Sequence, residues 1–185
     1  MHSSIKTEMM NAFEKVYASG NPLNIHHRIE HCSVINDSII LRIKKLGLIP
    51  FSTAFDETSV DFLEELDVPF YKIASFENTD VGLVKKIAST KKPIIMSTGM
   101  ASISELSESV TVARDNGCRD LVLLKCTSTY PASATDSNIS SIPHMRQLFN
   151  CEVGLSDHTL GLGVSVASIA LGATVIEKHF TLDRG

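Results

Sequence analysis

The chain has 185 residues, 43% of them hydrophobic, and a formal net charge of −4 at pH 7. This size and composition suffice to bury the core of one structural domain. Acidic and basic residues are interspersed, which argues against nucleic acid or a membrane surface as a partner. No apolar run approaches the ~20 residues that cross a bilayer, and the sequence shows neither an apolar signal segment nor a Cys-x-x-Cys spacing. We therefore predict a reduced, cytoplasmic protein.

The first part of the chain is expected to form a helix, a strand and a second helix. Apolar side chains at helical spacing indicate a helix over residues 4–19, and a strand over 25–32 and a helix over 37–46 follow. His27 and His31 would share one face of that strand. The pattern fits a second metal cluster and a polar strand end equally well.

From residue 48 onward, short apolar strands alternate with amphipathic helices. The strands are expected at residues 48–55, 70–75, 93–97, 121–127, 151–155 and 174–180. The helices are expected at residues 57–66, 81–87, from 102 or 104 to 116, near 143 and at 161–172. This alternation is typical of (β/α) units in a parallel sheet.

These elements favour an α/β fold of the (β/α)8 TIM-barrel type. With the strand at 25–32 the sequence contains seven predicted strands, whereas a closed barrel has eight. We therefore expect a truncated or chimeric barrel that forms one structural domain overall. An open doubly wound sheet is the structural alternative. The barrel is preferred because polar residues cluster at the end of almost every strand.

Two histidines stand where apolar strands end, each next to a carboxylate in the segment from Gly154 to Thr181. His158 follows Asp157, and His179 shares a strand face with Glu177 because side chains alternate along a strand. A helix of small residues between the two strands makes the pair a parallel crossover, so both histidines would lie at one sheet edge. This arrangement predicts a metal site, and two hydrogen-bonded structural histidines are the alternative.

Hydroxyl groups and two lysines mark the ends of the other strands. Lys72 and Lys125 lie inside apolar strands, where an unpaired ammonium is expensive to bury, so each is expected to contact an anion or a carboxylate. Together with the hydroxyls they predict a phosphate site. Individual hydroxyls have a simpler interpretation as helix N-caps, which applies to Ser52, Thr98 and Ser102.

Six motifs occur in one order along the chain. They are Phe51-Ser52-Thr53 with Phe55-Asp56, Lys72-Ile73-Ala74-Ser75 with Glu77, Ser97-Thr98-Gly99-Met100, Cys126-Thr127 with Tyr130-Pro131, Gly154-Leu155-Ser156-Asp157-His158, and Glu177-Lys178-His179-Phe180. With them, residues 47–183 closely resemble the catalytic barrel of the sialic acid synthase family. Lys125 before Cys126 is more similar to the pseudaminic and legionaminic acid synthase branches than to the N-acetylneuraminate branch.

The resemblance implies an enzyme that condenses phosphoenolpyruvate with an N-acetylated hexose and releases phosphate. It implies that His158 and His179 ligate a divalent metal (Mn2+, Mg2+ or Co2+), which polarises the sugar aldehyde. It also implies Glu177, Glu77 and Lys72 as catalytic residues, Glu77 facing the sugar, and a homo-oligomer, expected to be a dimer. The implied substrate-binding residues are Thr53, Ser75, Ser97, Ser128, Tyr130 and Ser156, of which Tyr130 faces the sugar.

The chain also departs from the family pattern. The glutamate and Asn-His-Asn-Gly loop of the family's first strand and the Lys-x-Gln of its second are absent, and residues 1–46 weakly resemble a segment of metal-dependent amidohydrolases. We therefore expect an amidohydrolase-like segment at 1–46 joined to a partial synthase barrel at 47–185, with weak or no activity. The alternatives are a non-catalytic barrel fragment that self-associates and a metal-dependent hydrolase built on His27 and His31.

Overall fold

The computed structural model describes residues 28–29, 41, 45–47 and 49–179. The chain divides into two compact units, of which the first comprises Met1–Thr53 with Phe180–Gly185 and the second comprises Ala54–His179. The described part of the first unit contains strands β1 (Arg28–Ile29) and β2 (Ile49–Pro50), which pair in parallel. The helix expected over residues 4–19 lies outside the described residues. The division falls a few residues after the boundary that the sequence analysis placed at 46 and 47.

The second unit, Ala54–His179, contains a five-stranded parallel sheet. Its strands are β3 (Tyr71–Ile73), β4 (Ile94–Ser97), β5 (Leu121–Cys126), β6 (Glu152–Asp157) and β7 (Ile176–Lys178). Their order in the sheet is their order in the sequence, with every neighbouring pair parallel. Such a consecutive order is typical of the wall of a (β/α) barrel, whereas a doubly wound sheet reverses its order at a switch point.

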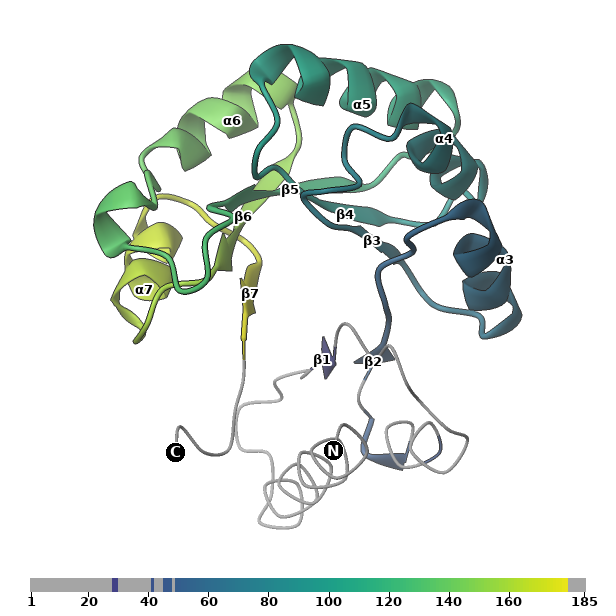
Figure 1. Cartoon of the computed structure of the whole chain (residues 1–185), viewed down its shortest axis with the longest axis horizontal. Coiled ribbons are helices and arrows are strands. Elements are labelled where there is room, and N and C mark those ends of the chain that lie inside the picture. Colours follow the sequence, from purple (N-terminus) through teal and green to yellow (C-terminus); the bar gives the residue numbers. More distant parts are fainter. Residues whose placement is uncertain (1–27, 30–40, 42–44, 48, 180–185) are drawn as a thin grey trace. The chain divides into compact units, whose positions relative to one another are not determined.

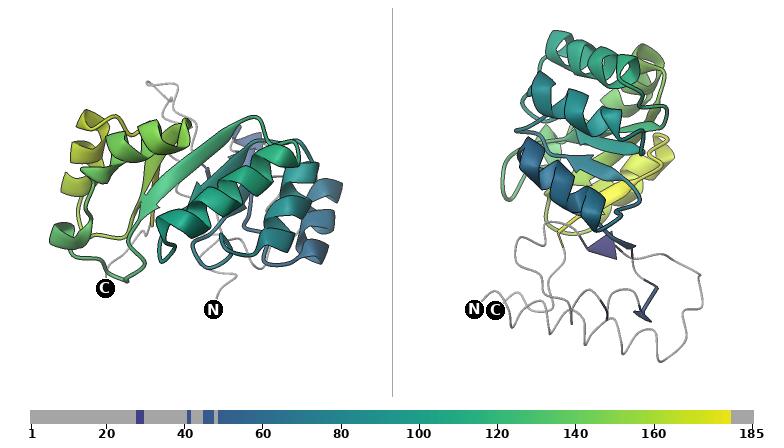
Figure 2. Two further views of the ribbon diagram at one scale, coloured as in Figure 1. Left: turned by 90° about the horizontal axis from the view of Figure 1, so that it is seen from above. Right: turned by 90° about the vertical axis from the view of Figure 1, so that its right-hand side faces the viewer.

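Five α-helices lie beside this sheet, all on its convex side (Figure 1, Figure 2). They are α3 (Glu57–Glu65), α4 (Val81–Ser89), α5 (Ile103–Asp115), α6 (Ser141–Phe149) and α7 (Gly163–Ala170), with the short 3-10 helix η1 (Ala134–Asp136) before α6. Helices on one face only confirm the barrel type and exclude the doubly wound alternative. Among the described residues, no helix has both the length and the apolar character needed to span a membrane.

The hydrophobic core lies between the sheet and the helices because strand side chains alternate in direction. Tyr71 and Ile73 of β3 belong to this core, as do Ile94 and Met96 of β4. Lys72, between the two β3 residues, therefore points to the opposite face of the sheet, which we call the inner face. Helix α5 adds Leu106, Val110 and Ala113 to the core.

Side-chain caps fix where the helices begin. The Ser102 hydroxyl accepts a hydrogen bond from the Glu105 N–H at the start of α5, and the Glu105 carboxylate accepts one from the Ser102 N–H, which makes a capping box. The N-cap interpretation thus holds for Ser102. Thr98 instead donates to the Leu124 carbonyl, 3.0 Å away. Helix α5 ends before Gly117, whose φ of +110° few other residues tolerate.

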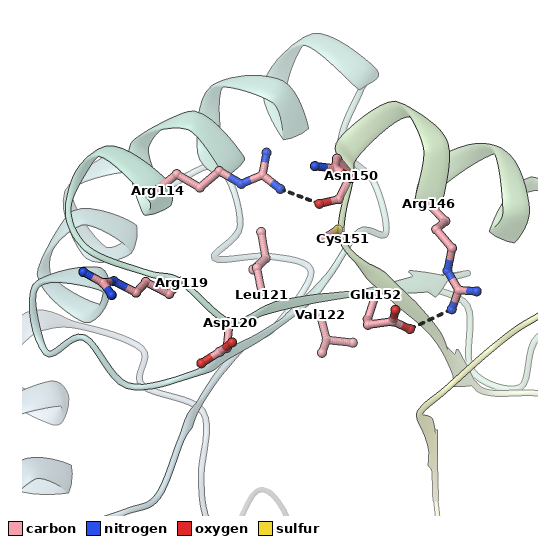
Figure 3. A pocket seen from close by; sticks show the side chains of 9 residues that line it. All are labelled: Arg114, Arg119, Asp120, Leu121, Val122, Arg146, Asn150, Cys151 and Glu152. Carbon is pink, nitrogen blue, oxygen red and sulfur yellow. Dashed lines mark hydrogen bonds and ion pairs between the residues drawn. The ribbon is translucent and has the colours of Figure 1, made fainter.

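A pocket lies at the amino-terminal ends of β5 and β6 (Figure 3). Its arginines are mostly engaged in structural contacts: Arg114 donates to the carbonyls of Phe149 and Asn150 at the end of α6. Arg146 pairs with Glu152 at 2.7 Å and donates to the Gly172 carbonyl after α7. Cations at helix C-termini are stabilising, and the amino-terminal end of a (β/α) barrel generally serves stability. We therefore assign this pocket a structural role.

Candidate active site

The polar side chains that the sequence analysis selected come together on the inner face of the sheet. Strand alternation directs one polar residue from each of the five strands to this face, always near the carboxyl end. These residues are Lys72 of β3, Ser97 of β4, Cys126 of β5, Ser156 of β6 and Glu177 of β7. Active sites of (β/α) barrels lie at this end of the strands.

Lys72 lies at the centre of this group and is almost fully buried, with 1% of its side chain exposed. Its ammonium lies 3.0 Å from Glu177 Oε2 and donates a hydrogen bond to Ser97 Oγ at 2.9 Å. The carboxylate partner meets the expectation for Lys72, because an ammonium is buried at acceptable cost only when paired. Three strands are thereby joined through one side chain.

Ser156 connects Glu177 to the first histidine. Its hydroxyl donates to Glu177 Oε1 at 2.6 Å and lies 3.5 Å from His158 Nε2. The other ring nitrogen of His158, Nδ1, lies 2.9 Å from the Thr127 carbonyl and donates to it. This hydrogen bond fixes the ring and leaves Nε2 as the nitrogen with an available lone pair.

The two histidines lie together, as predicted from their positions at neighbouring strand ends. The ring centroids of His158 and His179 are 5.2 Å apart with nearly perpendicular planes. Tyr130 covers both, with centroid distances of 4.2 Å to His158 and 5.7 Å to His179. Burial and the neighbouring His158 lower the pKa of His179, which favours the neutral form that binds metals. Within the described part of the chain, no three His, Cys, Asp or Glu residues are grouped as metal ligands.

Cys126 is a site residue that the sequence analysis did not select. Its thiol lies 3.3 Å from Ser75 Oγ and 3.8 Å from Ser128 Oγ. Burial alone would raise the pKa of Cys126, but hydrogen bonds with His158, Ser75 and Ser128 lower it to about 7. The hydrogen bond with Cys126 in turn raises the pKa of His158, against the effect of burial. Alternation along β5, which turns Cys126 inward, was the signal that could have identified it.

Gly99 allows the loop after β4 to approach the serines closely. Its N–H donates to Ser75 Oγ at 3.2 Å. A β-carbon at this position would lie 2.8 Å from Ser75 Oγ and would also clash with Ser128 Oγ. The absence of a side chain at residue 99 is therefore a requirement of the packing around Ser75 and Ser128.

Glu77 belongs to the same compact unit as this group of residues, whereas Thr53 does not. Burial raises the pKa of Glu77, while the nearby Lys72 ammonium lowers it in part. Glu77 Oε2 is buried, and among the described residues it has no hydrogen-bond partner. Thr53 belongs to the first unit, outside the unit that contains the other predicted site residues. His27 and His31, the basis of the hydrolase alternative, lie outside the described residues.

Two charged residues have other partners than their positions in the sequence suggest. Lys125 does not meet a carboxylate among the described residues; its ammonium donates to the Cys126 carbonyl and to Thr127 Oγ1. Asp157 does not accompany His158 in the metal site, because it points to the opposite face of β6 and accepts a hydrogen bond from Ser165 of α7. Adjacent residues on a strand face opposite ways, so sequence proximity was misleading here.

A lysine, serines, carboxylates and a histidine pair thus lie at the carboxyl end of a one-sided (β/α) sheet, where enzymes of the (β/α)-barrel class carry their active sites. The family model described as the NeuB family matches residues 5–185. The chain belongs to this family, which confirms the resemblance to sialic acid synthases. The matched range includes the segment that weakly resembles amidohydrolases.

Curated relatives carry names within the same family. The chain is 48% identical over 138 residues to a pseudaminic acid synthase of Campylobacter jejuni, covering 75% of this chain and 40% of the relative. It is 45% identical over 148 residues to an N,N'-diacetyllegionaminic acid synthase of the same species, covering 79% of this chain and 44% of the relative. The chain thus spans less than half the length of these relatives.

A solved structure shares the fold. The N-acetylneuraminic acid synthetase of Leptospira borgpetersenii superimposes with a TM-score of 0.81 at 27% identity, covering 98% of this chain and 69% of that one. The similarity extends over almost the whole length of the chain.

Proposed function

We propose that this chain carries a phosphoenolpyruvate and metal site of a nonulosonic acid synthase, which condenses phosphoenolpyruvate with an N-acetylated hexose. The observation that carries the proposal is the network Ser97–Lys72–Glu177–Ser156–His158, which links an anion-binding group to the histidine pair. Membership of the NeuB family and the names of the relatives support the reaction class.

Phosphoenolpyruvate needs cationic and hydroxyl donors for its phosphate and carboxylate. Lys72 supplies the buried positive charge, and the hydroxyls of Ser75, Ser97, Ser128 and Ser156 supply hydrogen bonds from four loop or strand ends. In the free protein Glu177 neutralises Lys72. An incoming anion would compete with Glu177 for this ammonium. Binding of the anion would therefore weaken the ion pair between Lys72 and Glu177.

The carbon–carbon bond forms between the methylene carbon of phosphoenolpyruvate and the aldehyde carbon of the sugar. Water then adds at the carbon that carries the phosphate, and phosphate leaves with the electrons of the broken C–O bond. His158 Nε2 and the His179 ring would hold a divalent metal, and two imidazoles fit Mn2+ or Co2+ better than Mg2+, which prefers oxygen ligands. The metal would supply polarisation of the aldehyde oxygen.

The two glutamates suit opposite proton transfers. Glu77, whose pKa is raised by burial, is suited to donate a proton to the developing sugar hydroxyl. Glu177, held by Lys72 and Ser156, is placed to accept a proton from the attacking water. Tyr130, which is more than half exposed and makes a tilted ring contact with His158, would contact the sugar.

The pseudaminic or legionaminic branch is favoured over the N-acetylneuraminate branch. Lys125 precedes Cys126, and the relatives described above carry the names of the first two branches. We also propose a cytoplasmic location and a homodimer, which sedimentation equilibrium would test.

The test is condensation at stoichiometric protein concentration with phosphoenolpyruvate, Mn2+ and a panel of N-acetylated hexoses. We expect phosphate release that requires both metal and sugar, at a rate far below that of an ordinary enzyme, and a further loss in Glu177→Gln. The exposed Lys85→Met variant on α4 is the control and should behave like the wild type. Phosphate release without sugar, or the complete absence of both phosphoenolpyruvate binding and phosphate release, would contradict the proposal.

A further inference from the structure

Two side-chain pairs join β6 to β7 on opposite faces of the sheet. In the strand register Ser156 lies opposite Glu177, and Asp157 lies opposite Lys178. The first pair is hydrogen bonded at 2.6 Å on the inner face, within the candidate active site. The second is an ion pair at 2.8 Å on the helix side, outside that site.

Asp157 connects three segments of the chain. Its side chain is fully buried and accepts hydrogen bonds from Thr159 N at 2.9 Å, Thr159 Oγ1 at 2.7 Å and the Ser165 hydroxyl on α7. Lys178 completes this shell and also donates to the Thr159 carbonyl at 2.8 Å. The carboxylate thereby ties the end of β6, the loop after His158 and the start of α7 to β7.

The register of β6 against β7 decides which residues face the site. A slip by one residue would exchange the faces of every side chain on the strand. Because β6 is also paired with β5, the slipping strand would be β7. Glu177 and His179 would then point toward the helices, and the pairing of Ser156 with Glu177 would be lost. A buried ion pair specific to one register excludes that alternative, because the slipped state would bury unpaired charges.

We propose that Asp157 and Lys178 are positioning residues that hold the His158 and His179 rings together across the β6–β7 junction. They flank the histidines in sequence and act through the backbone, without touching the proposed substrate. The inference rests on the proposed function only for its metal readout, since the arrangement of the rings is a property of the free protein.

The variants are Lys178→Met, Asp157→Asn and Lys178→Arg in the full chain. In the first two we expect Mn2+ affinity, measured by calorimetry, to fall at least about tenfold, as when residues that orient metal ligands are removed. We also expect loss of the nuclear Overhauser contact between the His158 and His179 rings, whose centroids are 5.2 Å apart. Lys178→Arg retains both donor contacts and should preserve both readouts. If Lys178→Met does not fold, Asp157→Asn provides the test, because asparagine is close in volume to aspartate.

Two controls separate positioning from general destabilisation. Lys86→Met removes another lysine–aspartate pair, with Asp61 at 2.7 Å, far from β6 and β7 in the sequence. Val110→Ala opens a cavity in the core beside α5 and lowers stability without touching the site. Both should keep the Mn2+ affinity and the ring contact.

The outcomes are distinct. If Lys178→Met and Asp157→Asn both keep the Mn2+ affinity and the ring contact, the positioning role is overturned. It is also overturned if Val110→Ala, at the same melting temperature as these variants, loses the Mn2+ affinity and the ring contact to the same extent. If the wild type binds no Mn2+, the metal part of the proposed function fails. The ring contact in the same variants then still decides the positioning role.

Discussion

At the scale of single residues, the site depends on charges and hydroxyls that are buried only because they are paired. Lys72 is the main example, since its ammonium is removed from water and meets Glu177 and Ser97 instead. A lysine inside an apolar strand predicts that its ammonium contacts an anion or a carboxylate. The sequence did not predict that this carboxylate belongs to Glu177, because β3 and β7 are far apart in the sequence.

Replacing Lys72 by methionine tests this pairing. The variant leaves the Glu177 carboxylate without its ammonium, so we expect a loss of unfolding free energy of about 3 kcal/mol. Phosphoenolpyruvate binding should also weaken by more than about tenfold, the effect of losing a charge-assisted contact. Urea denaturation and calorimetry give the two values, with Lys85→Met as the surface control. Unchanged binding of phosphoenolpyruvate would remove Lys72 from the substrate site.

Gly99 offers a second test at this scale. An alanine there would place its β-carbon against the hydroxyls of Ser75 and Ser128, so Gly99→Ala should lose about 1–3 kcal/mol of stability through overpacking. Removing one of the hydroxyls should restore part of the loss. A double-mutant cycle with Ser128→Ala, measured by urea denaturation, therefore predicts a positive coupling between the two positions. Purely additive effects would show that the clash is absent.

At the scale of elements, strand and helix positions followed well from the sequence. Apolar runs separated by amphipathic helices predicted β3 to β7 in the right order, and Gly117 and Ser102 marked the ends of α5. Strands β3, β4, β5 and β7 were predicted too long, because buried residues beside a strand, such as Phe70 and Ser75, lie outside β3. Strand β6 instead extends beyond its predicted end at residue 155 to Asp157. Hydrophobicity indicates burial, whereas strand length depends on pairing.

The capping box of α5 gives a pH prediction for this element. Hydrogen bonds from the Ser102 N–H and hydroxyl lower the pKa of Glu105. A carboxylate whose pKa is lower in the folded state contributes stability above its unfolded pKa, and this contribution is lost as the pH falls through the folded pKa. Wild type should therefore melt at a higher temperature than Glu105→Gln at pH 7. The difference should shrink as the pH falls below the ordinary pKa of a glutamate and vanish below the lowered pKa of the folded state. A difference independent of pH would contradict a role of the charge.

At the scale of the whole molecule, the sequence predicted which residues belong to the candidate site better than it predicted their contacts. The histidine pair, the serines, Lys72 and Glu177 come from strand ends that the parallel register brings together. Asp157 lies on the face opposite to His158 because neighbouring strand residues face opposite ways, and Cys126 was missed because a cysteine in an apolar strand resembles core packing. Thr53 belongs to the first unit. Sequence motifs identify the residues of the site, whereas the strand face of each residue and the residues that it contacts follow only from the folded sheet.

We propose that the inner face of this sheet carries a site for phosphoenolpyruvate and a metal ion. The most direct measurement is a calorimetric titration of the purified chain with Mn2+, with and without phosphoenolpyruvate, for the wild type, His158→Ala and His179→Ala. We predict that the wild type binds Mn2+ and that each histidine variant loses this binding, because two imidazoles are needed to hold the ion. The absence of Mn2+ binding in the wild type, or unchanged Mn2+ binding in both variants, would contradict this proposal.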